Sequence, residues 1–223
     1  MRYKAIIFDM DGTIVHTEHL WAQATCKVFE NRGHQLTELQ KDTLKHQLMG
    51  SGLPHACQII KDMLGTPDSV EIIMKEKLAL ADQLYEQGIA FIDGFLDFHQ
   101  KVISIPLLVG VATNATMHTV QRTECSLNLS SYFGQHVYTI NHVENRGKPN
   151  PAIYLYAAAQ LGIAPEHCIA IEDSAHGITA AKAAGMLCIG INTSKKPEQT
   201  KKAHLIVNRY EEISLENLLC RGS

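Results

Sequence analysis

The stretch Ala5-Ile6-Ile7-Phe8-Asp9-Met10-Asp11-Gly12-Thr13 decides how the chain folds. Its first four residues form an apolar run of strand length, and two carboxylates follow where this predicted strand ends. Charges there are costly to bury without a partner, and two like charges so close together repel each other. A divalent cation would relieve the repulsion, and Gly12 permits a tight turn whose backbone is open to a ligand. The stretch therefore favours a site for a metal ion and a phosphate group.

The same residues also allow simpler interpretations. Asp-x-Asp-Gly is typical of an ordinary polar turn after a strand. A calcium loop would need a further Asp or Asn before the glycine, but Gly12 follows Asp11 directly. Glu18 does lie at a suitable distance beyond Gly12. The rest of the chain has to decide between a turn and a functional site.

Composition limits the classes of protein. The chain has 223 residues, enough for one large domain or a domain with an insert, and 45% of them are hydrophobic. A net charge of −3 argues against a nucleic-acid partner, and apolar runs of only strand length argue against a membrane partner and against secretion. The six cysteines are dispersed and contain no Cys-x-x-Cys, so a zinc cluster is not indicated. We expect a cytoplasmic monomer with reduced thiols.

Short apolar runs recur along the chain and predict further strands. They are nearly continuous in hydrophobicity and are separated by stretches of helical character, which indicates an α/β fold: a Rossmann-like parallel sheet with helices on both faces. Chemistry in such sheets gathers at the carboxyl ends of the strands. The predicted strands are Ala5–Phe8, Leu107–Ala112, Cys168–Ile171, Leu187–Ile191 and Leu205–Val207.

One interval interrupts this rhythm. Roughly a hundred residues without a convincing strand follow the first strand, which is too long for a single crossover helix. Helical patterns fill the interval, and glycines separate them. We therefore expect an inserted α-helical cap domain at residues 16–93, over a core domain built from residues 1–15 and 94–223. The predicted helices are Glu18–Asn31, Glu38–Gln47, Pro54–Met63 and Ser69–Gln87, and the chain would cross between the domains near Val15–Glu18 and Gly88–Asp93.

Polar groups also follow later predicted strands. Thr113 and Asn114 offer a hydroxyl and an amide that can donate hydrogen bonds to a phosphoryl oxygen, although helix capping is an alternative role. Lys148 precedes a helix that Asn150 and Pro151 would start, at a place where anions are favoured. A solvated loop lysine is the alternative there.

A second acidic pair, Glu172-Asp173, leaves another predicted strand. Ser174 can cap the helix Ala175–Ala184, and Asp173 could simply favour that helix electrostatically. A catalytic triad of Ser174, His176 and Asp173 lacks the Gly-x-Ser-x-Gly elbow. Each of these motifs has a simple alternative, but four of them at strand ends in a workable order favour one shared site.

Together the motifs resemble those of the haloacid dehalogenase superfamily, in the branch that inserts a helical cap after the first motif. The residues that carry the resemblance are Asp9-Met10-Asp11-Gly12-Thr13, Thr113, Lys148 and Glu172-Asp173. The stretch Glu172-Asp173-Ser174-Ala175-His176-Gly177 is especially similar to the sugar-phosphatase and β-phosphoglucomutase-like group. The resemblance covers residues 1–15 and about 94–223, whereas the cap matches only in type.

The resemblance implies a role for each motif. Asp9 would be the nucleophile that forms an aspartyl-phosphate, and Asp11 would protonate the leaving alcohol and then activate water. Mg²⁺ would be bound by Asp9, the backbone carbonyl of Asp11 and Asp173, with Glu172 contacting it through water. The catalytic residues would be Asp9, Asp11, Thr113 and Lys148, and the phosphate would be held by Gly12, Thr113, Asn114 and Lys148.

The implied function is a Mg²⁺-dependent phosphatase of a small phosphorylated metabolite, a sugar or polyol phosphate. A β-phosphoglucomutase-like phosphomutase and a non-catalytic phospholigand-binding protein are the alternatives. In the cap, we expect His19, Gly50 and Ser51 to face the substrate, from the stretch Thr17–Trp21 and the loop Gly50-Ser51-Gly52. His16 stands where relatives commonly carry aspartate, and nothing in the sequence explains this change.

Overall fold

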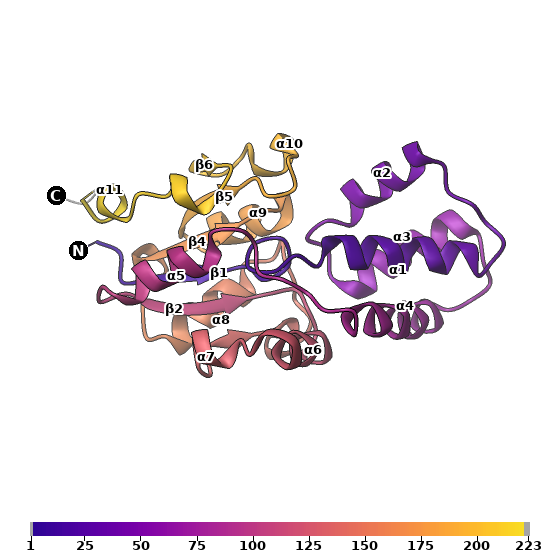
Figure 1. Cartoon of the computed structure of the whole chain (residues 1–223), viewed down its shortest axis with the longest axis horizontal. Coiled ribbons are helices and arrows are strands. Elements are labelled where there is room, and N and C mark those ends of the chain that lie inside the picture. Colours follow the sequence, from indigo (N-terminus) through magenta and orange to yellow (C-terminus); the bar gives the residue numbers. More distant parts are fainter. Residues whose placement is uncertain (1, 221–223) are drawn as a thin grey trace.

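A parallel six-stranded sheet forms the centre of the molecule, with strand order β3-β2-β1-β4-β5-β6 (Figure 1). The computed structural model of the chain describes residues 2–220. The strands are β1 Ala5–Phe8, β2 Leu108–Ala112, β3 Val137–Tyr138, β4 Cys168–Glu172, β5 Leu187–Ile191 and β6 Leu205–Val207. The predicted α/β fold class is confirmed. The sequence does not predict β3, because two residues are too short to show an apolar pattern.

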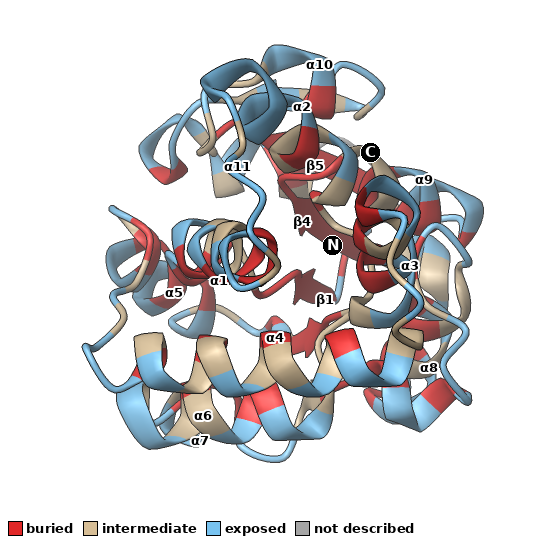
Figure 2. Cartoon of the chain, turned by 90° about the vertical axis from the view of Figure 1, so that its right-hand side faces the viewer, coloured by how far each residue is buried: buried red, intermediate tan, exposed pale blue. Residues whose placement is uncertain are grey.

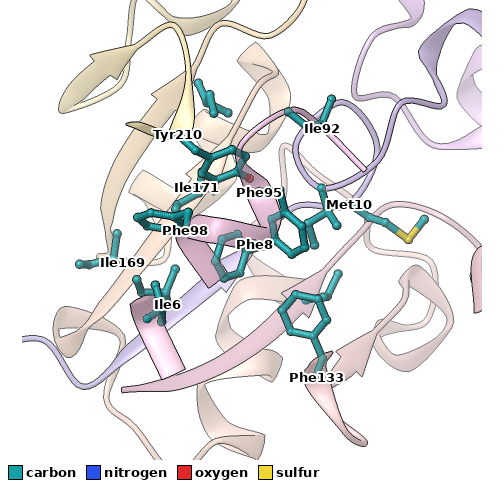
Figure 3. Packing of buried hydrophobic residues seen from close by; sticks show 14 of the residues in the cluster. Ile6, Phe8, Met10, Ile92, Phe95, Phe98, Phe133, Ile169, Ile171 and Tyr210 are labelled. Atoms are coloured by element: carbon teal, nitrogen blue, oxygen red, sulfur yellow. The ribbon is translucent and has the colours of Figure 1, made fainter. Parts of the chain in front are cut away.

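Helices cover both faces of the sheet because alternate strand residues point to opposite sides. Ile6 and Phe8 pack against α5 (Phe95–Ile103), α7 (Ser130–Phe133) and α11 (Leu215–Cys220). Phe8 lies among aromatic rings of this face, with its centroid 5.8 Å from those of Phe95 and Phe133 (Figure 3).

The opposite face of the sheet is lined by smaller side chains. Ala5 and Ile7 of β1 belong to one apolar cluster with buried residues of α8 (Ala152–Gln160) and α9 (Ala175–Ala183). Both helices present buried alanines to the strands, which allows close packing. This close packing brings the first turn of each helix near the carboxyl ends of β1 and β4. The remaining elements are α6 Met117–Leu127, α10 Pro197–Thr200 and the 3₁₀ turns Ile140–Val143, Pro165–His167 and Tyr210–Glu212.

Four helices form a separate layer beyond the carboxyl ends of the strands (Figure 1). They are α1 Glu18–Glu30, α2 Glu38–Leu48, α3 Leu53–Leu64 and α4 Val70–Tyr85, and each lies within two residues of its predicted bounds. Two of them begin at capping residues, since Thr37 and Gln40 form a capping box at α2 and Ser69 caps α4. The layer has its own apolar cluster, which contains Val28, Phe29, Leu44, Cys57, Ile60, Leu64 and Ile73.

Two neighbouring segments connect this layer to the sheet. Val15 forms a bridge with Phe91, the amide of His16 donates to the carbonyl of Ala90 at 2.9 Å, and the amide of Ile92 donates to Ile14 at 2.8 Å. The outgoing and returning chains therefore pair with each other at the junction. Figure 2, viewed from the side of the helical layer, shows buried strands β1, β4 and β5 surrounded by helices with exposed outer faces. Over residues 2–220, every helix is too short or too polar to cross a lipid bilayer.

Candidate active site

The sheet register brings the motifs to one edge. Phe8 of β1 pairs with Val111 of β2 and with Ile171 of β4, so the residues that follow these strands become neighbours. The amide of Asp9 donates to the carbonyl of Ile171 at 2.9 Å, which fixes the start of the first motif against the second acidic pair. Strand pairing thus sets the separation of the residues that directly follow β1, β2 and β4.

Lys148 lies at the centre of the site and is buried. Its Nζ donates to Asp9 Oδ1 at 2.5 Å and to Glu172 Oε1 at 2.6 Å. Burial by itself would lower the pKa of Lys148, but the attraction of Asp9 and Glu172 outweighs burial and raises the pKa. Lys148 is therefore a fixed positive charge next to Asp9, and it is not a solvated loop lysine.

Glu172 orients this lysine. Its carboxylate is fully buried and accepts hydrogen bonds from the Tyr154 hydroxyl at 2.7 Å and the Ser174 hydroxyl at 3.1 Å, in addition to Lys148. A Cβ atom at Gly177 would lie 1.7 Å from Glu172 Oε1, so only glycine leaves room for the carboxylate. Sequence reasoning missed the role of Tyr154; the signal was a buried-type aromatic with a polar tip on the helix that follows Lys148.

Asp9, Glu172 and Asp173 form an acidic cluster, with one carboxylate oxygen from each lying within 4.8 Å of the others. Burial raises the pKa of Asp9 to about 8, although Lys148 opposes this, and it raises the pKa of Asp173, which Asp9 and Glu18 raise further. Within residues 2–220, Asp173 Oδ2 and Glu18 Oε1 are buried and have no hydrogen-bond partner.

This donor set fits a hard divalent cation such as Mg²⁺. Asp9 and Asp173 can each offer an oxygen, whereas Glu172 Oε1 is bound to Lys148 and Tyr154, which suits the more distant role expected for Glu172. Gly12 lies directly beside the cluster, and a Cβ there would lie 2.3 Å from Asp173 Oδ2. Glycine is therefore needed at position 12 for space as well as for its φ of +82°.

Asp11 is tied to the first residues of the helical layer. Thr17 Oγ1 donates to Asp11 Oδ1 at 2.5 Å. Burial raises the pKa of Asp11, and hydrogen bonding by Thr17 and Trp21 partly opposes this. A carboxyl group with a raised pKa is suited to donate a proton and to take it back.

Thr113 and Asn114 have different surroundings. Thr113 is buried, and its Oγ1 accepts from the amide of Ala115 at 2.9 Å, which leaves the hydroxyl proton free to donate into the cavity. The Asn114 side chain was expected to bind phosphate, but its amide nitrogen donates to the carbonyls of Gly50 and Lys148, at 2.9 and 3.3 Å. Its Oδ1 accepts from the amide of Lys148 at 2.8 Å. The side chain of Asn114 therefore joins two loops, and Asn114 also lines the main cavity.

The loop after α2 reaches the predicted site. Gly50 packs so closely on the core that a Cβ there would lie 2.4 Å from Ser174 Oγ, and the carbonyl of Met49 lies 3.2 Å from His176 Nδ1. Ser51 lines the same cavity, with its hydroxyl donating to the carbonyl of Leu48. The structure thus brings Gly50 and Ser51 to the cavity that Asp9, Asp11 and Asp173 also line.

The structure does not bring His19 there. His19 is exposed and lines a smaller pocket of about 230 Å³, together with His16 and Lys45. Successive helical residues are rotated by roughly 100°, so His19 and Trp21 face different directions. Within the stretch Thr17–Trp21 that was expected to face the substrate, it is Trp21 that faces Asp11 and lines the main cavity.

The main cavity has a volume of about 630 Å³ and lies between the carboxylates and the helical layer. Lys77 of α4 lines it, with only 3% of the residue exposed, and Lys77 Nζ lies 5.7 Å from the centroid of the Trp21 ring. Burial lowers the pKa of Lys77 to about 8. The sequence gives no sign of this lysine's position, because a lysine within a charged helix usually faces solvent.

A parallel sheet with acidic pairs at adjacent strand ends, a buried lysine between them and an inserted helical layer defines an α/β protein with a buried, charged site at the carboxyl ends of its strands. The family model for haloacid dehalogenase-like hydrolases matches residues 6–191, and the chain belongs to this family. The resemblance seen in the motifs is confirmed.

Relatives of known name share most of the chain. Phosphorylated carbohydrates phosphatase of Thermotoga maritima is 31% identical over 187 residues, which cover 82% of each chain. Hexitol phosphatase B of Escherichia coli is 30% identical over 190 residues, covering 83% of this chain and 82% of the relative. Among solved structures, CbbY of Rhodobacter sphaeroides in complex with xylulose-(1,5)bisphosphate has a TM-score of 0.79 at 25% identity, covering 95% of this chain and 96% of CbbY.

Proposed function

We propose that the protein is a Mg²⁺-dependent phosphatase that hydrolyses a small phosphomonoester through an aspartyl-phosphate on Asp9. The observation that carries the proposal is the position of Asp9, held by Lys148 on one side and beside Asp173 on the other, with Asp11 lining the same cavity. The names of the relatives support a sugar or polyol phosphate as the substrate.

In the first half-reaction, a carboxylate oxygen of Asp9 attacks phosphorus as the bond to the leaving oxygen breaks. Asp11 transfers its proton to that oxygen, so the alcohol leaves neutral. Asp9 must be ionised to attack, and Lys148 favours its ionised form. Mg²⁺, held by Asp9, Asp173 and the backbone carbonyl of Asp11, would supply the remaining positive charge next to the carboxylates and the phosphoryl oxygens.

In the second half-reaction, Asp11 takes a proton from water, and the water oxygen attacks the phosphorus of the aspartyl-phosphate. The bond between phosphorus and the Asp9 oxygen breaks, which releases phosphate and restores the carboxylate. Throughout, Lys148 and the Thr113 hydroxyl would hold phosphoryl oxygens in place. Phosphoryl transfer depends mainly on such positioning and charge stabilisation.

The helical layer would act as a cap that excludes water from the first step. We propose residues 16–93 as this cap and residues 1–15 and 94–223 as the core. The paired connections at Val15 and Phe91 support a hinge at this boundary, and Gly50 and Asn114 provide a contact between cap and core.

A metabolite panel tests the proposal. Sorbitol, glucose and glycerol phosphates are incubated with the protein, and released phosphate is measured with Mg²⁺, with chelator and with Ca²⁺. We expect release only with Mg²⁺, because Ca²⁺ coordinates more loosely and would misplace Asp9. Asp9→Asn should lower turnover by about 10⁴-fold or more, because an amide cannot form the acyl phosphate.

The other outcomes distinguish the alternatives. Acid-quenched enzyme should carry phosphate on the peptide that contains Asp9. Isomerisation of a glucose phosphate without release of phosphate would indicate a phosphomutase. Saturable binding of a phosphorylated metabolite without any turnover would indicate a non-catalytic binding protein.

A further inference from the structure

The main cavity continues beyond the catalytic carboxylates. From Trp21 it runs on between α1 and α2 as one space with the site of Asp9 and Asp173. We call this extension the α1–α2 groove. Its apolar walls are Ala22 and Cys26 of α1, Leu44 and Leu48 of α2, and Leu36 of the segment that joins the two helices.

Contacts on two sides of α2 fix its position beside α1. In the part of the chain that the structure describes, Leu44 is the only buried residue of α2, and it joins the apolar cluster of the cap. The opposite side of α2 is held by the core, where Asp42 accepts from Lys196 Nζ at 3.0 Å and His46 Nδ1 lies 3.2 Å from Glu198 Oε1. Held from both sides, α2 leaves Cys26 and Leu48 only half-buried.

The chemistry of the cavity changes along its length. The inner end carries the catalytic carboxylates and Lys77, the middle is the apolar wall of the groove, and the outer rim carries Glu30, Glu38 and Lys41. When an apolar ligand displaces water from half-buried apolar walls, the free energy of binding becomes more favourable. The whole cavity, at about 630 Å³, lies within the range of about 300 to 1,000 Å³ that accommodates drug-sized ligands.

We propose that the α1–α2 groove is a subsite for an aliphatic tail on the leaving alcohol. The phosphate and the first polar carbons occupy the inner end, and a tail of several methylene groups lies between Cys26 and Leu48. The substrate class is then a phosphomonoester of an amphiphilic alcohol, such as a polyol with an alkyl extension. This inference rests on the proposed phosphatase activity, and it adds a determinant of specificity that a plain sugar phosphate would leave unused.

A series of n-alkyl phosphates from ethyl to octyl tests the groove. We expect kcat/KM to rise by about two- to fourfold for each added methylene, as burial of methylene groups predicts, and to level off where the tail reaches the charged rim. Cys26→Trp fills the groove, so the kcat/KM for octyl phosphate divided by that for ethyl phosphate should fall close to one. His19→Trp is the matched control, because His19 lies on α1 but outside the groove, and it should keep the wild-type ratio.

Cys26→Asp gives a second variant that adds little volume. Its carboxylate should also reduce the dependence on chain length, because an alkyl tail would have to desolvate it. If ethyl phosphate is hydrolysed but kcat/KM does not change with chain length, or if both Cys26 variants keep the wild-type ratio, the groove is not a tail subsite and the phosphatase proposal stands. If neither the alkyl esters nor the metabolite panel releases phosphate, the proposed function itself is wrong.

Discussion

Two lysines, one in the core and one in the cap, are similarly buried, but their surroundings shift their pKa values in opposite directions. Lys148 is 5% exposed and Lys77 is 3% exposed. Asp9 and Glu172 raise the pKa of Lys148 above its ordinary value, whereas burial lowers the pKa of Lys77 to about 8, although Cys57 opposes this. Partners, and not burial, therefore decide the charge of a lysine here. Among the described residues, the buried lysine of the core is paired with two carboxylates, whereas the buried lysine of the helical layer has no carboxylate partner.

Lys148→Met should have the largest effect, because it removes the paired lysine of this comparison. Removing the cation leaves Asp9 and Glu172 close together without compensation, so we expect a loss of about 3 to 5 kcal/mol in the free energy of unfolding and a fall in kcat of about 10³-fold. Urea denaturation and phosphate release measure the two effects. Lys182→Met on α9 is the control, because Lys182 is exposed and should leave both values nearly unchanged.

Gly177→Ala tests whether Glu172 must hold its present position. The new methyl group would overlap Glu172 Oε1, so the carboxylate has to move away from Lys148 and Tyr154. We expect a loss of about 2 to 3 kcal/mol in the free energy of unfolding, with a lower kcat and a little-changed KM. Thr179→Ala, at an exposed position of the same helix, should stay within about 0.5 kcal/mol of wild type. A Gly177→Ala protein as stable as this control would show that the contact is not restrictive.

Lys77→Met should have the opposite sign and stabilise the protein. At neutral pH the wild-type lysine is charged in a site that disfavours charge, so replacing it should raise the free energy of unfolding by about 2 kcal/mol. The folded pKa of about 8 lies below the ordinary 10.5, so the cost is fully present below pH 8 and disappears as pH rises through 10.5. The gap between variant and wild type should therefore narrow over this window in denaturation measured at several pH values. A gap that is constant with pH would mean that Lys77 is not held against its charge.

Ion pairs at the surface should matter least. Asp82 of α4 accepts from Arg122 of α6 at 3.0 Å and lies 3.0 Å from His118, which links cap and core outside the cavity. Because these groups are partly exposed, Asp82→Asn should lower the free energy of unfolding by less than about 1 kcal/mol, and the difference should shrink at high salt. Urea denaturation at low and high salt checks this. A larger change in the free energy of unfolding that is the same at low and high salt would show that the stability of the cap depends on this contact.

Local patterns predict much of the fold and the core motifs. The apolar run before Asp9 and the helical patterns between the glycines of residues 16–93 are properties of neighbouring residues, so strand β1 and helices α1 to α4 follow from the sequence. The carboxyl ends of parallel strands meet at one edge, which is why Asp9, Thr113 and Asp173 could be assigned to one site without coordinates.

The rest depends on contacts between residues far apart in the chain. Asn114 and Gly50 are separated by 64 positions, and nothing near either residue indicates that the Asn114 amide is used by the cap loop. Trp21 and Lys77 meet only because α1 packs against α4. The expectation for His19 failed for a related reason, since the helical rotation that separates it from Trp21 matters only once the orientation of α1 is known.

The contact between Asn114 and the carbonyl of Gly50 allows the position of the cap to be followed through the NMR signals of the Asn114 side chain. Asn114 also holds the backbone of Lys148, so under the proposed opening of the cap its side chain would stay fixed to the core and would exchange only the bond to Gly50 for water. The two side-chain amide protons of this one asparagine should therefore shift in ¹⁵N-resolved NMR spectra as the cap opens. A titration with substrate or with inorganic phosphate would then follow cap closure through a single pair of resonances, without any attached label.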